Sequence, residues 1–154
     1  MAEFSIDFTG FDEQDPMVAI GVIRLGEDHE YFESVLGFWG LDDYKAIWTA
    51  GLRRLISGAS TSCLATSVTD PSSANFVEVW PLYREESDVY VQNHLLFLDQ
   101  LPHELDPTEP WASVRPRSVV DEDGQRISEW RVSIDDIGEF LKLSSISQYP
   151  GRSE

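Results

Sequence analysis

Short apolar segments separated by acidic turns open this sequence, and they constrain its fold more than any other feature. Residues 4–11 alternate apolar and polar side chains, residues 17–25 (MVAIGVIRL) are apolar almost throughout, and residues 31–39 return to a mixed pattern. Runs of this length, bounded by turn residues, predict three β-strands, of which the second is central. The acid-rich stretches 12–16 and 26–29 predict the turns that join them.

A helix is predicted over residues 42–57, because apolar side chains there recur at spacings of three and four and so share one helical face. Two acids in its first turn and two arginines in its last turn complement the helix dipole. Gly58 is expected to end this helix in the left-handed conformation. The pattern of residues 134–143, with Ser133 as the N-cap, predicts a second helix.

Three more strands are predicted over residues 61–69, 76–83 and 89–98, each rich in apolar side chains. Residues 84–88 between the last two strands suit a hairpin loop. Pro81 has no amide hydrogen to donate to a neighbouring strand, so we expect an edge or a bulge at this position.

A second hairpin is predicted from residues 117–120 to residues 127–132, turning through 121–124, where Asp-Gly tolerates a positive φ. Antiparallel hairpins with two principal helices predict an α+β fold, a single domain over residues 1–143 built on a mainly antiparallel curved β-sheet. Residues 144–154 are polar and are expected to form a flexible tail. The order of elements also suggests a two-fold pseudo-repeat, each half being a β-meander followed by a helix.

The charge of the chain restricts its partners. Twenty-eight Asp and Glu against eleven Lys and Arg give a formal net charge of −17. Nucleic acids and anionic membranes are bound through Lys and Arg, so we expect neither as a direct partner, and a basic protein instead. The sequence has no apolar run long enough to span a membrane and no positive secretory leader, which predicts a cytoplasmic location.

No pattern in the sequence indicates catalysis or a bound metal. It has no G-x-S-x-G elbow, no phosphate-binding loop and no zinc-like spacing of its three histidines. Cys63 lies in a strand-like apolar segment, where packing is the expected role. The acids of residues 121–124 resemble a calcium loop, but the required glycine is absent from the sixth position. We therefore expect no catalytic residue, no cofactor and no metal.

The remaining candidates for function are carboxylates concentrated in four predicted turns. Such turns are usually solvated surface, and that interpretation remains open. Together they could also form a surface that attracts a basic protein and accelerates its association. The candidate binding residues are Asp12, Glu13, Asp15, Glu27, Asp28, Glu30, Glu85, Glu86, Asp88, Asp121, Glu122 and Asp123.

A set of short motifs resembles the immunity proteins of bacterial contact-dependent growth inhibition (CdiI-type) systems. The similarity spans about residues 36–141 and is weaker before them. The matching pieces are Thr66-Ser67, Asp70-Pro71, Trp80, residues 82–85 (LYRE), residues 89–93 (VYVQN), Phe97 and residues 127–130 (ISEW). The aromatic side chains in these motifs alternate along predicted strands, which favours a role in the core.

The resemblance implies that the chain is no enzyme but an inhibitor. It would bind the C-terminal toxin domain of a delivered protein and neutralise that domain in the cytoplasm. Many such domains are nucleases with basic clefts, which an acidic inhibitor complements. We expect a cognate basic toxin, an interface of about 1,200–2,000 Å² and apolar anchors at its centre. Either the toxin's active site or its substrate-binding surface would be covered.

Two other functions stay open from the sequence. An acidic adaptor or chaperone for a secreted effector protein would bind an unfolded or exported segment instead of a folded toxin. A small hydrolase could use a pair of carboxylates that no sequence pattern marks out.

Overall fold

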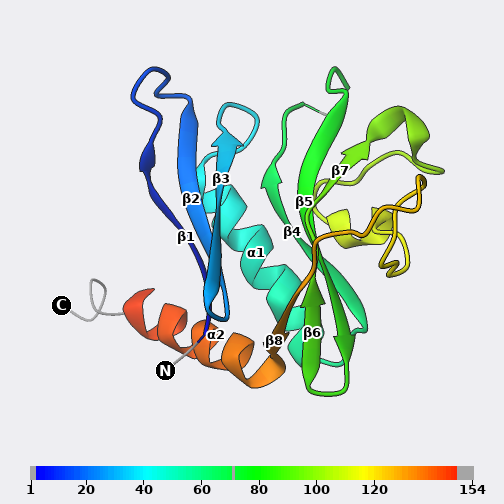
Figure 1. The fold of residues 1–154 in the computed structure, drawn as a ribbon. Coiled ribbons are helices and arrows are strands. Elements are labelled where there is room, and N and C mark those ends of the chain that lie inside the picture. The colour runs from blue at the N-terminus through cyan, green and yellow to red at the C-terminus, as the bar shows by residue number, and fades with distance from the viewer. Residues whose placement is uncertain (1–2, 71, 149–154) are drawn as a thin grey trace.

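The structure, a computed structural model, describes residues 3–70 and 72–148. It begins with an antiparallel meander in the order β1-β2-β3. These strands are β1 (Phe4–Phe11), β2 (Val18–Leu25) and β3 (Asp28–Val35), at the left of Figure 1. The third strand was predicted to begin later and to reach Trp39. It begins at Asp28 because the turn before it consists of only two residues, with Gly26 at φ +71°.

A second antiparallel sheet has the order β4-β5-β6-β8, and β7 pairs with β5 as well. Its strands are β4 (Thr61–Ser67), β5 (Phe76–Glu85), β6 (Asp88–Val91), β7 (His94–Phe97) and β8 (Trp130–Ser133). The α+β class with antiparallel strands and two principal helices is confirmed, although the strands divide between two sheets instead of forming one.

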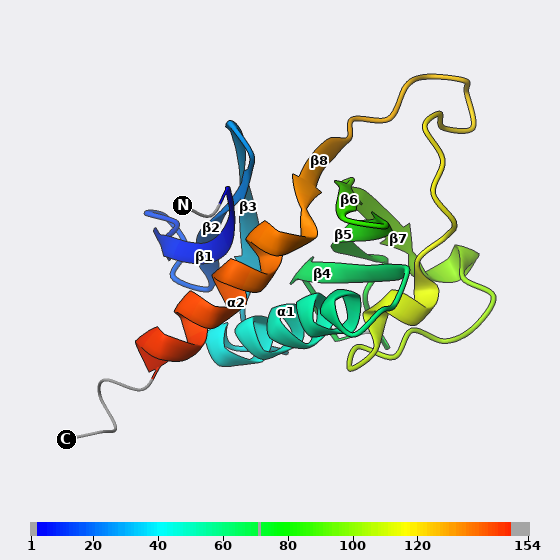
Figure 2. The same ribbon diagram turned by 90° about the horizontal axis from the view of Figure 1, so that it is seen from below.

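Helix α1 (Leu41–Ile56) lies behind the seam between the two sheets (Figures 1 and 2). Trp48 on this helix contacts both of them. Its ring centroid lies 4.9 Å from that of Phe8 and 5.7 Å from that of Phe32, both in the first sheet. Its indole Nε1 donates a 2.7 Å hydrogen bond to the carbonyl of Ala65 in β4. One aromatic side chain therefore joins the sheets from within the core.

The ends of α1 follow the prediction closely. The Asp43 carboxylate accepts a 2.9 Å hydrogen bond from the amide of Gly40, which precedes the first helical residue. Gly58 has φ +112°, as expected of a residue that ends the helix. In the middle of the helix, Gly51 allows the backbone to approach the carbonyl of Cys63 more closely than a Cβ would permit.

Helix α2 (Ile134–Gln148) packs against the first sheet, where the Phe140 ring meets that of Phe4 edge-on at 5.6 Å. Ser133 caps it as predicted, because its hydroxyl accepts a 3.0 Å hydrogen bond from the amide of Asp135. The helix continues beyond the predicted end at residue 143, into the expected tail, and residues 149–154 lie outside the described residues. Three strands precede α1, whereas five lie between α1 and α2, so the second half does not repeat the first.

The single strand predicted over residues 89–98 is wrong, since two short strands, β6 and β7, take its place. They pair with successive parts of β5 on either side of Pro81, and the amide of Gln92 donates to the Pro81 carbonyl at 3.1 Å. In a strand, the amide and the carbonyl of one residue point toward the same neighbouring strand. The break between β6 and β7 therefore lies on the side of β5 where Pro81 has no amide hydrogen to donate. Pro81 therefore lies in an interior strand, not at an edge.

The second predicted hairpin forms only around its turn. A turn forms at residues 121–124, where Gly124 has φ +80°, but only one isolated bridge, between Val120 and Arg126, links its arms. The returning chain pairs with β6 instead, because β8 can bury Val132 against the core there.

Candidate functional site

The four acidic turns do not meet at one place. Because neighbouring strands are antiparallel, the β1–β2 turn with Asp12, Glu13 and Asp15 lies at the opposite end of the first sheet from the β2–β3 turn. Figure 1 shows the β2–β3 and β5–β6 turns at its lower end, the β1–β2 turn at its upper end and the segment before β8 at the side. The β2–β3 turn with Glu27, Asp28 and Glu30 and the β5–β6 turn with Glu85, Glu86 and Asp88 thus lie at the same end of the molecule, and the segment with Asp121, Glu122 and Asp123 lies elsewhere.

Three of these acids shape their own turns. Asp12 and Asp15 accept hydrogen bonds of 2.8 and 2.9 Å from the amides of Gln14 and Met17. Asp121 accepts 2.9 Å bonds from two amides of its own loop. Side chains that bond their own backbone in this way favour turns, so part of the acidic pattern has a local structural cause.

An open groove lies between the two sheets, on the face opposite α1, with a volume of about 460 Å³. Sequence reasoning did not identify it. Three of its apolar side chains are well exposed: Tyr31 at 66 %, Phe76 at 45 % and Leu95 at 46 %. The residues that line it are Ile20, Tyr31, Phe32, Glu33, Val35, Ser67, Phe76, Glu78 and Leu95.

Strand register determines which side chains reach the groove. In the first sheet Ile20 pairs with Glu33, so both point to the same outer face. In the second sheet Glu78 pairs with Leu95, and the adjacent row on that face pairs Phe76 with Phe97. The alternation of side chains along β3 and β5 could have indicated which residues are exposed. It could not have indicated that the exposed residues of the two strands line a common groove.

The groove is acidic as well as apolar. Its two charged lining residues are both carboxylates, Glu33 and Glu78. Glu78 is held by a 2.8 Å hydrogen bond from the hydroxyl of Thr66 and a 3.4 Å bond from the amide nitrogen of Asn93. Exposed aromatic side chains gathered beside carboxylates mark this groove as a candidate binding surface.

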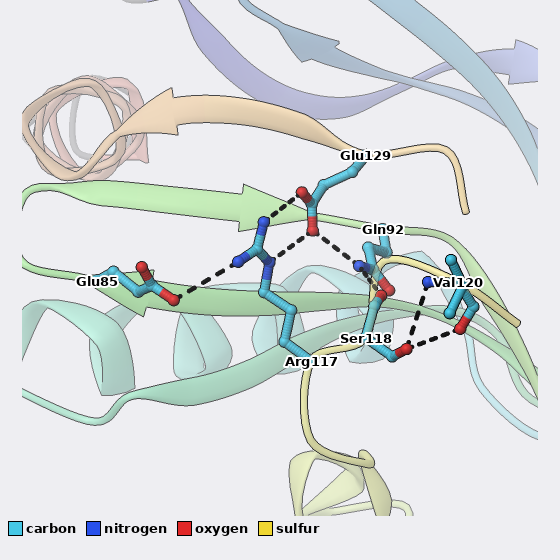
Figure 3. A network of polar contacts seen from close by, with 6 residues as sticks. All are labelled: Glu85, Gln92, Arg117, Ser118, Val120 and Glu129. Atoms are coloured by element: carbon cyan, nitrogen blue, oxygen red, sulfur yellow. Dashed lines mark hydrogen bonds and ion pairs between the residues drawn. The ribbon is translucent and has the colours of Figure 1, made fainter. Parts of the chain in front are cut away.

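A charged network fixes the loop before β8 (Figure 3). Arg117 makes two hydrogen bonds with Glu129, of 2.7 and 2.6 Å, and lies 3.6 Å from a carboxylate oxygen of Glu85. Its guanidinium carbon stands 3.9 Å from the ring centroid of Tyr90. The hydrogen bonds from Arg117 hold the pKa of Glu129 below its usual value. Glu85 thus takes part in a structural contact.

The same loop borders a second groove of about 660 Å³, which includes His94, Arg115 and the acids at residues 121–123. Burial, with a further contribution from the nearby charge of Arg115, lowers the pKa of His94. This histidine lies half-buried in β7.

The part of the chain that the structure describes holds no group of three or more side chains arranged for a metal ion. Cys63 is buried, as expected, and burial raises the pKa of its thiol. A buried neutral thiol is a poor nucleophile, so its role is packing. None of the described helices is long and apolar enough to cross a bilayer.

Comparison with known proteins identifies the family. A family model described as the CdiI N-terminal domain matches residues 34–140. The chain belongs to the CdiI family. It is 33 % identical over 118 residues to the immunity protein CdiI of Enterobacter cloacae subsp. cloacae, covering 77 % of this chain and 81 % of that protein. The resemblance stated from the sequence motifs is thereby confirmed.

A solved structure extends the CdiI match to the whole fold. A chain of the CdiA-CT/CdiI toxin and immunity complex from Enterobacter cloacae superposes with a TM-score of 0.82 at 30 % identity, covering 92 % of this chain and 98 % of that one. The fold match therefore reaches beyond the family range, which begins at residue 34 near the end of β3. Phe76, Glu78 and Leu95 of the groove lie within the family range, and Tyr31 and Glu33 precede it.

Proposed function

We propose that this CdiI protein binds and neutralises the C-terminal toxin domain of its cognate CdiA protein in the cytoplasm, and that this toxin domain is a basic nuclease. The observation that carries the proposal is the net charge of −17 on a chain whose solved relative comes from a toxin and immunity complex. A nuclease must attract a polyanion, so its binding surface is positive. An acidic inhibitor complements that surface and also repels the substrate.

The acidic turns are proposed to steer the toxin and to surround the contact. The group formed by the β2–β3 and β5–β6 turns combines six candidate carboxylates at one end of the molecule. Exposed charges of this kind contribute more to the association rate than to the lifetime of a complex. Steered association reaches about 10⁸–10⁹ M⁻¹s⁻¹ at low salt.

The test uses the toxin domain encoded beside this chain, with RNA and DNA as substrates. Equimolar protein should abolish nucleic-acid cleavage, and a toxin domain from an unrelated system should stay active in the same assay. The association rate should fall steeply between low and physiological salt. Unchanged cleavage by the cognate domain at equimolar protein would contradict the proposal.

Charge reversal separates the turns. Glu27→Lys with Glu30→Lys changes the lower group, and Asp12→Lys with Glu13→Lys changes the upper turn by the same net charge. If the lower group steers the toxin, the first pair should slow association about tenfold more than the second. Equal slowing by both pairs would assign steering to net charge alone.

A further inference from the structure

We propose that the groove between the two sheets is the centre of the toxin-binding surface and receives an arginine or lysine side chain of the toxin domain. This proposal rests on the proposed function, because it names the place and the chemistry of that contact. The partner is thus a folded basic protein that presents a cation into an aromatic and acidic groove.

The first argument is the distribution of apolar surface. Tyr31, Phe76 and Leu95 are large, exposed and brought to one groove from separate strands. Phe97, 42 % exposed, extends this surface, since its ring centroid lies 6.0 Å from that of Phe76. Exposed apolar surface gathered at a hollow marks binding sites, and aromatic side chains are the usual anchors of protein interfaces.

The second argument is the charge within the groove. Its charged lining residues are Glu33 and Glu78, and the described lining residues include no Lys, Arg or His. Within residues 3–70 and 72–148, Glu33 makes no ion pair. Two carboxylates without a neighbouring cation favour a positively charged occupant.

The third argument is the combination of ring and carboxylate. A guanidinium can lie on an aromatic face while its N–H groups donate to a carboxylate, and a lysine ammonium can do the same less specifically. Tyr31 and Phe76 offer rings from opposite walls, and Glu33 and Glu78 stand on the same two walls. An apolar side chain would leave both carboxylates desolvated, and an acidic one would be repelled.

The fourth argument is the rigidity of the walls. The hydroxyl of Ser34 in β3 donates a 2.5 Å hydrogen bond to the carbonyl of Thr66 in β4, across the seam. Tyr44 reaches the seam from α1, donating at 2.7 Å to the carbonyl of Val35 and accepting at 2.9 Å from the amide of Val68. The groove is therefore held open in one shape before binding, which lowers the entropic cost of the complex.

Single substitutions with matched controls test the proposal against the purified toxin domain. Tyr31→Ala, Leu95→Ala and Glu33→Lys should each weaken binding, with Tyr31→Ala raising Kd about 30-fold or more. The controls are Leu143→Ala, an exposed leucine on α2, and Glu104→Lys, an exposed acid in the loop between η1 (Leu98–Gln100) and η2 (Pro110–Ser113). Both controls should bind within about twofold of the unsubstituted protein. Urea unfolding of each variant separates loss of binding from loss of fold.

A double-mutant cycle identifies the occupant. Alanine variants of the surface arginines and lysines of the toxin domain are each combined with Tyr31→Ala. At least one should show a coupling of about fivefold or more in Kd. Coupling with none of these cations would overturn the proposed occupant.

The outcomes distinguish this proposal from the proposed function. If the unsubstituted protein neither binds nor inhibits the toxin domain, the proposed function fails. If it inhibits fully while all three groove variants bind as tightly as the controls, the proposed function stands and the groove proposal is wrong.

Discussion

Arg117 and Glu129 form a bidentate pair, in which Nε and Nη2 of the arginine donate hydrogen bonds of 2.7 and 2.6 Å to the two carboxylate oxygens. The pair closes the loop that leads from η2 to β8, a segment with little backbone pairing of its own. The buried Gln92 donates to the same carboxylate at 2.8 Å, which ties the loop to the second sheet (Figure 3). Side-chain contacts thus position β8 and, through it, the start of α2.

Glu129→Ala should lower the free energy of unfolding by about 1–3 kcal/mol, because the guanidinium loses both of its short hydrogen bonds and the buried Gln92 amide keeps only its bond to the Ser118 carbonyl. Glu85→Ala removes only the longer ion pair to the same arginine, and the Glu85 side chain is 63 % exposed. That variant should lose less than about 1 kcal/mol. Urea unfolding at neutral pH measures both. Equal losses of unfolding free energy in the two variants would show that the bidentate pair contributes no more stability than the longer ion pair.

The same pair predicts a pH dependence. Hydrogen bonds from Arg117 hold the pKa of Glu129 below its usual value in the folded state. The unfolded state therefore binds its proton first as pH falls, and the stabilisation is present above the ordinary glutamate pKa of about 4.3 and is lost below it. The stability difference between the unsubstituted protein and Glu129→Ala should shrink as pH is lowered through this range. A constant difference from pH 7 to pH 3 would contradict it.

Gly51→Ala should destabilise the fold by about 1–3 kcal/mol or more, because the new Cβ would collide with the Cys63 carbonyl where α1 crosses β4. Gly138→Ala in α2 is the matched control. There the nearest atom, Cδ1 of Ile56, is 3.7 Å away, an ordinary contact. Alanine in a helix is favoured over glycine by roughly 0.5–1 kcal/mol, so this variant should be neutral or stabilised. Equilibrium unfolding in urea compares the two.

Tyr44→Phe should cost about 1–3 kcal/mol of stability, since it leaves the Val35 carbonyl and the Val68 amide without their partner at the buried seam. Tyr31→Phe, at a 66 % exposed position, should leave stability unchanged. An alkaline titration offers a second readout, because burial raises the pKa of Tyr44 to about 12. Burial raises the pKa of Tyr83 to about 12 as well. The late tyrosinate signal should therefore decrease in Tyr44→Phe without vanishing, and it should be unchanged in Tyr31→Phe.

Local patterns predicted α1 and the start of α2, although not the end of α2. The apolar spacing of Tyr44, Trp48 and Leu52 placed α1 within one residue of its observed ends, and Ser133 marked the start of α2. Helical ends depend on neighbours within four residues, so the sequence contains the necessary information. The strand pairing near Pro81 and Gly124 was less predictable, because it depends on contacts between residues far apart in the sequence.

The candidate site was predicted only in its chemistry. Net charge indicated a basic protein partner, and the motifs indicated the family, but the acidic turns were grouped without knowledge of their positions. Antiparallel pairing sends Asp12 and Glu27 to opposite ends of one sheet. Conversely, no sequence feature distinguishes Tyr31 and Leu95 from other strand residues, and only the fold places both of them in one groove.

The amino-acid sequence alone determined the α+β class, both helices, the acidic character and the family of this protein. These properties follow from local periodicity, composition and short motifs, which need no knowledge of distant contacts. The tertiary structure decided that the strands form two sheets and that β8 pairs with β6. It also decided that a rigid acidic groove opens between the two sheets. Those features arise from packing between residues far apart in the chain, where burial of apolar surface selects one arrangement among many that the local pattern allows.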